Sequence, residues 1–135
     1  MIEFFIPGKP VPKARPRLGK GGHVYTPAKT KAAEELIRNI AAREYGDEEP
    51  VVTAVKLAVS FAMPVPKSWP KQKRFDAFSG EMYPLSRPDL DNMVKTVSDA
   101  LNGVIYVDDS QIVELRCQKA YMAEEGTYVT VRWCE

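Results

Sequence analysis

The sequence contains few of the residues on which several classes of protein depend. It has one histidine, His23, and two cysteines, Cys117 and Cys134, among 135 residues. A serine or cysteine nucleophile is usually activated by a histidine. Because His23 lies in a Gly-rich loop, we expect it to be a surface residue or a phosphate contact and not a catalytic residue. The two cysteines lack the close spacing of a zinc ligand pair and are too few for a disulfide scaffold, so we expect reduced packing residues.

Long hydrophobic runs are also missing. The longest apolar segment, residues 51–63, is interrupted by Thr53, Lys56 and Ser60, which makes it too short and too polar to cross a bilayer. The N-terminus has no basic region ahead of an apolar stretch, so it does not resemble a signal peptide. With 44% hydrophobic and 27% charged residues, the composition is that of a globular protein. We therefore expect one domain, residues 1–135, in the cytoplasm and without a membrane partner.

The net charge is only +1, but the charge is unevenly distributed along the chain. Residues 1–31 contain seven Lys or Arg and one Glu, a charge of +6, and residues 64–88 contain five basic and two acidic residues, a charge of +3. The remainder carries −8. Two basic segments around an acidic centre suit a polyanionic ligand and a metal-binding site, although solvated loops also collect lysine residues.

The apolar periodicity predicts six elements in the order β-α-β-α-β-β. The expected strands are residues 1–6, 51–63, 112–122 and 127–133, the last two joined as a hairpin. The expected helices run from Thr26, as N-cap, to about Tyr45, where Gly46 ends the helix, and from residue 90 or 91 to 101, before Gly103. Irregular stretches fill residues 7–25 and 64–88. This order predicts an α+β domain with helices packed on a mixed sheet.

The sharpest chemical pattern is RPDLDNMVKTVSDALNG followed by VIYVDDSQ. Pro88 favours an extended conformation before it, so Asp89 and Asp91 can face the same way at the start of a helix. Asp108 or Asp109 could supply a third carboxylate from another element. Converging carboxylates repel one another unless a cation neutralises them, and Mg²⁺ is the natural candidate because it also takes water and phosphate oxygens. Such a site suits hydrolysis of a phosphodiester.

Each of these residues also has a purely structural interpretation. An aspartate at the helix start could act as a cap, and the Asp108-Asp109 pair could form a turn. Lys95 could form an exposed ion pair with Asp91, worth about 0.3–0.5 kcal/mol, or it could stabilise charge beside a metal site.

Two other classes of D-x-D protein do not fit the sequence. A calcium loop of the EF-hand type would need a central glycine and a late glutamate, which DLDNMVKTVSDA lacks. A haloacid-dehalogenase-type phosphatase would place D-x-D after a buried apolar strand, whereas YPLSRP precedes it here.

Taken together, these residues resemble the signature of RusA-type Holliday junction resolvases. The family pattern is D-x-D-N, a lysine four residues after the second aspartate, D-A-L, and then D-D-x-Q. This chain has every part of it: Asp89, Asp91, Asn92, Lys95, Asp99, Ala100, Leu101, Asp108, Asp109 and Gln111. The N-terminal run PGKPVPKARPR with HVYTP also resembles that of many members.

The resemblance implies a small homodimeric endonuclease that uses Mg²⁺ to cut four-way DNA junctions by paired symmetric nicks in recombination or repair. The metal-binding aspartates of the family fall on Asp89, Asp91 and Asp109, and its catalytic lysine falls on Lys95. The second aspartate of the D-D pair is thereby chosen over Asp108. Two alternatives are a nuclease for other branched or flapped DNA, and a non-catalytic DNA-binding protein whose aspartates are structural.

Basic residues of the N-terminal stretch are expected to contact DNA phosphates, which position DNA without reading its sequence. They are Lys13, Arg15, Arg17 and Lys29. Trp69, Phe75 and Phe78 could stack on unpaired bases at a junction centre, or they could serve packing or dimer contact. The stretch from 64 to 88 is long compared with that of compact family members, and its role is open.

Overall fold

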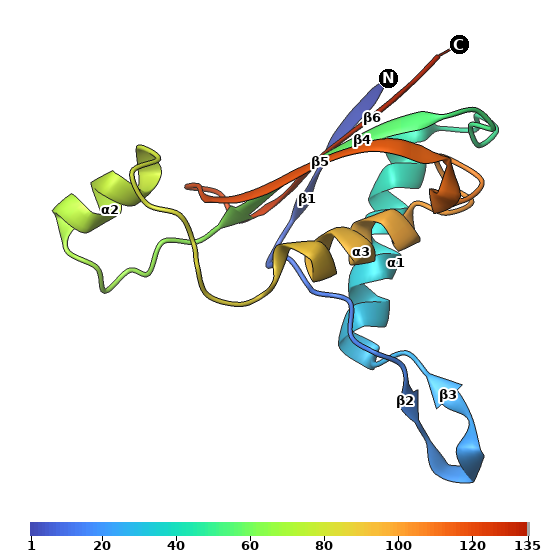
Figure 1. Ribbon diagram of the computed structural model, residues 1–135, viewed down its shortest axis with the longest axis horizontal. Coiled ribbons are helices and arrows are strands. Elements are labelled where there is room, and N and C mark those ends of the chain that lie inside the picture. The colour runs from blue at the N-terminus through green and yellow to red at the C-terminus, as the bar shows by residue number, and fades with distance from the viewer. Residues whose placement is uncertain (135) are drawn as a thin grey trace.

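A four-stranded sheet with two helices on one face forms the body of the protein (Figure 1). The computed structural model describes residues 1–134. The strands are β1 (Ile2–Pro7), β4 (Val55–Met63), β5 (Ile112–Tyr121) and β6 (Gly126–Trp133), and their order in the sheet is β1-β6-β4-β5. β4 runs parallel to β5 and antiparallel to β6, so the sheet is mixed. The predicted α+β class is confirmed.

Helices α1 (Ala28–Tyr45) and α3 (Leu90–Ala100) cover the same face of the sheet, below it in Figure 1. The period of two along β4 turns every second side chain toward these helices, each at most 2% exposed: Val55, Leu57, Val59 and Phe61. On α3, Met93 and Val97 meet them and are also buried. This alternation was predicted from the sequence, although β4 begins at Val55 and not at Val51.

The ends of α1 are only partly as predicted. Gly46 ends the helix with φ 78°, a conformation that glycine adopts without strain. At the other end the N-cap is Pro27, whose side chain makes no capping hydrogen bond, so the prediction of Thr26 as the cap is wrong. Instead, Thr30 in the first turn accepts a hydrogen bond from the backbone N–H of Ala14 at 3.2 Å, which ties the preceding segment to the helix.

The predicted hairpin between the last two strands is also wrong. β4 lies between β5 and β6 and pairs with both, so that Val59 is opposite Cys117 on one side and Val129 on the other. A short connection between two strands favours a hairpin locally. Here the most apolar strand occupies the centre of the sheet instead, because that position buries its side chains and pairs its backbone on both edges.

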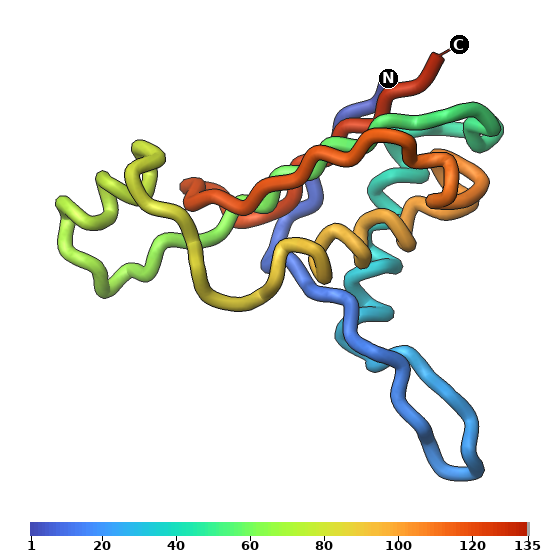
Figure 2. The backbone as a smooth tube through the Cα atoms, viewed as in Figure 1, coloured from blue at the N-terminus to red at the C-terminus, as the bar shows by residue number. Residues whose placement is uncertain are grey.

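Two segments project from the body as arms (Figure 2). The hairpin arm, residues 8–27, contains β2 (Arg17–Leu18), the 3-10 turn η1 (Lys20–Gly22) and β3 (Val24–Tyr25), which form a separate two-stranded sheet. The α2 arm, residues 64–88, contains α2 (Lys71–Phe78) and is therefore not wholly irregular. Only Ala77 of α2 is buried, so this helix lacks the apolar stripe from which helices are predicted.

The remaining sequence expectations concern isolated residues. Cys117 and Cys134 are both free; Cys117 packs against the core, whereas Cys134 is exposed and is not a packing residue. His23 is exposed, as expected for a surface residue. Within residues 1–134, no helix is both long enough and apolar enough to span a membrane.

Tyr106 attaches the loop after α3 to the helix itself. Its side chain is 0% exposed, and its hydroxyl donates a hydrogen bond of 2.7 Å to the backbone carbonyl of Ser98. Burial raises the pKa of Tyr106, so the phenol stays neutral and remains a donor. Backbone bridges from Tyr106 to Val51 and Asn102 extend this attachment to the segment before β4.

Tyr106→Phe removes the hydroxyl and keeps the ring. Because the Ser98 carbonyl loses this buried partner, we expect the free energy of unfolding to fall by about 1–3 kcal/mol. Tyr128→Phe, at a β6 side chain that is 42% exposed, is the matched control, with an expected change within about 0.5 kcal/mol. Urea unfolding followed by circular dichroism measures both. Equal midpoints for Tyr106→Phe and the unsubstituted protein would contradict a stabilising role for this bond.

Candidate active site

The start of α3 carries two exposed aspartates with little protein contact. Asp89 is the N-cap residue, with extended backbone at φ −72° and ψ 138°, and Asp91 lies in the first turn. The side chain of Asp89 makes no capping hydrogen bond. Neither aspartate forms a salt bridge with another residue in the described part of the chain. The side-chain capping role considered for Asp89 is therefore absent, and both carboxylates face solvent.

Lys95 lies one turn after Asp91, but its ammonium is turned toward two other carboxylates. Its Nζ is 3.1 Å from Oδ1 of Asp99 and 3.7 Å from Oδ2 of Asp109. The i,i+4 ion pair thus forms with Asp99 and not with Asp91. The hydrogen bond to Asp99, followed by the attraction of that carboxylate, raises the pKa of Lys95 above its ordinary value. The ammonium is therefore charged at neutral pH.

The two adjacent aspartates after α3 have different surroundings. Asp108 caps the 3-10 turn η2 (Asp109–Gln111), where its Oδ2 accepts a hydrogen bond of 3.0 Å from the backbone of Ser110. This hydrogen bond lowers the pKa of Asp108. The carboxylate of Asp109 instead faces Lys95. Of the two, Asp109 is the residue that the structure brings to the α3 lysine.

Gln111 holds the turn that carries Asp109. Its Nε2 donates hydrogen bonds of 2.8 Å to the backbone carbonyls of Val51 and Thr53, and its Oε1 accepts one of 2.9 Å from the backbone of Asp108. All polar groups of this side chain are used in fastening η2 to the segment before β4. The glutamine of the D-D-x-Q pattern marked this position in the sequence, without indicating these contacts.

Lys119 of β5 holds the chain directly before Asp89. Its Nζ donates to the backbone carbonyls of Ser86 at 2.9 Å and Pro88 at 3.1 Å. Sequence reasoning missed this residue. The contact depends on the parallel register of β5 beside β4, which no local pattern reveals.

The base of the hairpin arm is held between the two helices. The backbone N–H of Lys13 donates to the carbonyl of Asn92 at 2.8 Å, and its ammonium pairs with Glu34 of α1 and, at 3.3 Å, with Asp99 of α3. Burial lowers the pKa of Lys13, but the two carboxylates outweigh it and keep the pKa above its ordinary value. Lys13 is thus engaged by acidic groups of the protein. The other predicted phosphate contacts are exposed: Arg15, Arg17 and Lys29.

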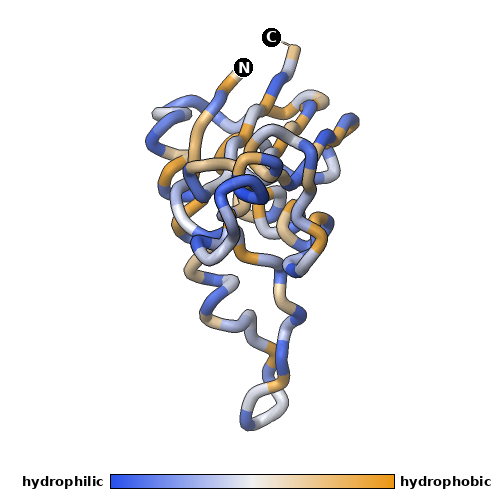
Figure 3. Tube along the Cα trace, turned by 90° about the vertical axis from the view of Figure 1, so that its left-hand side faces the viewer, coloured by the Kyte–Doolittle hydropathy of each residue, from blue (hydrophilic) through white to orange (hydrophobic). Residues whose placement is uncertain are grey.

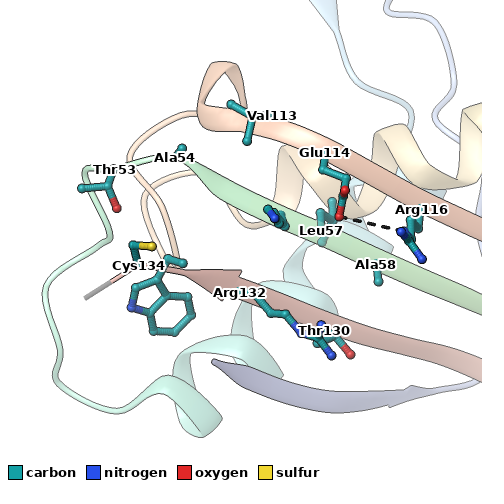
Figure 4. A pocket seen from close by; sticks show the side chains of 12 residues that line it. Thr53, Ala54, Leu57, Ala58, Val113, Glu114, Arg116, Thr130, Arg132 and Cys134 are labelled. Carbon is teal, nitrogen blue, oxygen red and sulfur yellow. Dashed lines mark ion pairs between the residues drawn. The ribbon is translucent and has the colours of Figure 1, made fainter.

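A cavity of 330 Å³ adjoins the start of α3 and places cations beside Asp89. Its lining includes Lys9, Lys29 and Arg87. A hollow of 710 Å³ lies on the sheet around β4, β5 and β6 and contains none of the candidate residues (Figure 4). The cavity at the start of α3 therefore contains Asp89 and Lys29 of the predicted residues, and the hollow on the sheet belongs to a different surface.

The donors at the site suit a hard cation, but they are not gathered into a single cluster. Within residues 1–134, no three Asp, Glu, His or Cys side chains lie close enough together to hold a metal ion. The structure brings Lys95 to Asp109, while Asp89 and Asp91 lie at the helix start. Carboxylate oxygens are the ligands that Mg²⁺ prefers, and those of Asp89 and Asp91 have no ion-pair partner among residues 1–134 that would compete with it.

The chain matches one known protein family over most of its length. The family described as Endodeoxyribonuclease RusA matches residues 7–132, a range that includes both arms, α3 and η2. The chain is also 38% identical over 136 residues to YqaN of Bacillus subtilis (strain 168), which is described as uncharacterized. That match covers 97% of this chain and 95% of YqaN. The chain therefore belongs to the RusA endodeoxyribonuclease family.

Proposed function

We propose that the protein is a Mg²⁺-dependent endonuclease that resolves four-way DNA junctions by paired symmetric nicks, in recombination or repair. The observation that carries the proposal is the position of Lys95. It lies on the helix that begins with Asp89 and Asp91, and its ammonium is 3.7 Å from the carboxylate of Asp109. Family membership supports DNA cleavage in general.

The residues have separate roles in this mechanism. Asp89, Asp91 and Asp109, the proposed ligands of Mg²⁺, are not clustered in this structure and would have to converge when the ion binds. The bound ion would activate water and stabilise charge on the attacking and leaving oxygens. Lys95 offers a charged ammonium to a non-bridging phosphate oxygen. Asp99 holds the same ammonium at 3.1 Å and so orients it toward Asp109. Gln111 keeps Asp109 in place through the turn η2.

Exposed cations near the site would guide the DNA backbone toward these aspartates. Lys29 lines the 330 Å³ cavity that also reaches Asp89, and Arg15 and Arg17 continue along the hairpin arm. Phosphate contacts of this kind fix the position of DNA and carry little sequence information. Lys13 was predicted to contact phosphate as well. Because Glu34 and Asp99 already pair with it, we propose that it mainly orients the base of the arm.

We propose that the active unit is a homodimer. Two nicks in strands of like polarity need two identical sites, and a two-fold axis supplies them at matching positions. The sheet face opposite α1 and α3 supports this proposal, because no helix of residues 1–134 covers it (Figure 1). The hollow on β4, β5 and β6 also contains apolar side chains that pairing with a second copy would remove from water, Val113 and Trp133.

A labelled four-way junction, incubated with and without Mg²⁺, tests this function. We expect symmetric paired cuts only in the presence of Mg²⁺. Preferred cutting of flapped DNA would favour a nuclease for other branched substrates, and binding without cutting would favour a non-catalytic protein. A monomeric mass in sedimentation, together with accumulation of singly nicked cruciform plasmid, would contradict the dimer and leave the metal site standing.

Asp109→Asn and Asp108→Asn form a matched pair of neighbouring substitutions. Loss of a metal ligand removes several kcal/mol of charge stabilisation, so we expect Asp109→Asn to slow junction cleavage at least about a hundredfold. Asp89→Asn and Asp91→Asn should do the same. Asp108→Asn should keep near-normal cleavage, because an amide oxygen can still accept the hydrogen bond from Ser110. Single-turnover cleavage rates measure the difference between the two variants, and gel shifts in EDTA should show that junction binding is retained. Equal losses of cleavage for Asp109→Asn and Asp108→Asn would refute the assignment of Asp109 as the metal ligand.

Lys95→Met separates a catalytic lysine from a surface ion pair. We expect cleavage to fall about 10²–10³-fold, because an oriented cation beside the phosphate is lost. The free energy of unfolding should change by only about 0.3–0.5 kcal/mol, because the side chain is 55% exposed and helical ion pairs contribute little. Lys31→Met, on the exposed part of α1, is the control. Normal cleavage by Lys95→Met would leave the residue with a surface role only.

A further inference from the structure

α2 presents phenylalanine rings and cations together on one exposed face. Lys71, Arg74, Phe75 and Phe78 recur at the i, i+3, i+4 and i+7 positions of a single helix face. Phe75 is 65% exposed and Phe78 is 46% exposed, whereas Ala77, which lies outside this face, is 2% exposed. The helix therefore packs through its small residue and leaves its large rings in water, an arrangement typical of a binding surface.

The base of the α2 arm is fixed to β5. Trp69 packs edge-to-face on Tyr121, with ring centroids 5.5 Å apart and an interplanar angle of 68°, and Nζ of Lys73 lies 4.0 Å from the centroid of the Trp69 ring. On the other side of the arm, Lys119 binds the backbone carbonyls just before Asp89. Trp69 thus has the packing role, one of the roles considered for it from the sequence, and these contacts hold the arm with its aromatic face outward.

The charge and position of the arm indicate what its exposed face binds. Residues 64–88 carry +3 and lead directly into Asp89. Figure 3, seen from the side of the arm, shows it in front of the sheet with the hairpin arm extending below. Cations contact phosphates and aromatic rings stack on bases, so a face that combines the two matches single-stranded DNA. A linear duplex offers phosphates but no free base faces.

We propose that this face of α2, formed by Lys71, Arg74, Phe75 and Phe78, binds unpaired bases beside the branch point of the DNA and thereby favours branched over linear DNA. The proposal rests on the proposed function for the branched substrate. It adds the part of the chain that distinguishes that substrate from duplex. Phe75 and Phe78 act as stacking platforms, and Lys71 and Arg74 hold the flanking phosphates.

Binding without cleavage tests this proposal. The full-length protein is titrated in EDTA against a four-way junction with unpaired thymines at its branch, a fully paired junction and a linear duplex. Phe75→Ala and Phe78→Ala should each raise the Kd for the first DNA about tenfold and change the Kd for duplex by less than about twofold. Leu85→Ala, at a 91% exposed apolar side chain of the same arm, is the matched control and should leave all affinities unchanged.

The outcomes separate this proposal from its competitors. Equal losses on all DNAs, or no loss on any, would overturn it. If the Phe75→Ala or Phe78→Ala variant changes from dimer to monomer but still discriminates between the DNAs as before, the proposal is also overturned. That result would show that the face binds a second copy of the chain. Both rings are exposed, so thermal midpoints should remain unchanged and confirm that the variants fold. If Phe75 and Phe78 discriminate between the DNAs but no Mg²⁺-dependent cutting occurs, the nuclease proposal is refuted and this one stands. If Mg²⁺-dependent cutting occurs but the two rings do not discriminate, the nuclease proposal stands and this one is refuted.

Discussion

The burial of β4 between two neighbouring strands and two helices is the constraint on which the rest of the structure depends. Each of its large inward side chains contributes about 1.5–3 kcal/mol when it is removed from water. β4 pairs in parallel with β5, and parallel strands cannot be joined by a tight turn. A long connection is therefore required, and here it is residues 64–111. This connection contains the α2 arm, Asp89, Asp91, Lys95 and Asp109. The parallel pairing in the core therefore requires the long connection that carries the candidate site.

The candidate site is assembled where this connection is fastened at several points. Lys119 fixes the chain before α3, Tyr106 fixes the loop after it, and Gln111 fixes the turn that carries Asp109. Most of these bonds end on backbone carbonyls, so they constrain the path of the chain and leave the carboxylates free for other partners. Exposed acids can therefore occupy defined positions without being neutralised by the groups that position them.

Features that depend on neighbouring residues were predictable from the sequence, and features that depend on distant pairing were not. The alternation along β4 and the end of α1 at Gly46 are local, and the structure contains both. The hairpin prediction failed because strand order is decided by total burial, and α2 was missed because it buries only Ala77. The role of Lys119 follows from sheet register. The sequence also could not show that the Lys95 ammonium would lie beside Asp109, since that contact depends on where η2 is held.

Asp99 is shared by two lysines from different parts of the chain, Lys13 at the base of the hairpin arm and Lys95 on α3. Each ammonium pairs with a different oxygen of this carboxylate, Lys13 with Oδ2 and Lys95 with Oδ1, so the position of one cation affects the electrostatic field at the other. If Lys13 moved away with the arm, Asp99 would keep Lys95 as its one cation partner, and the charge balance around the Lys95 ammonium beside Asp109 would change. The position of the hairpin arm and the electrostatic balance around Lys95 are thus linked through the side chain of Asp99, although the tip of the arm lies far from Asp99.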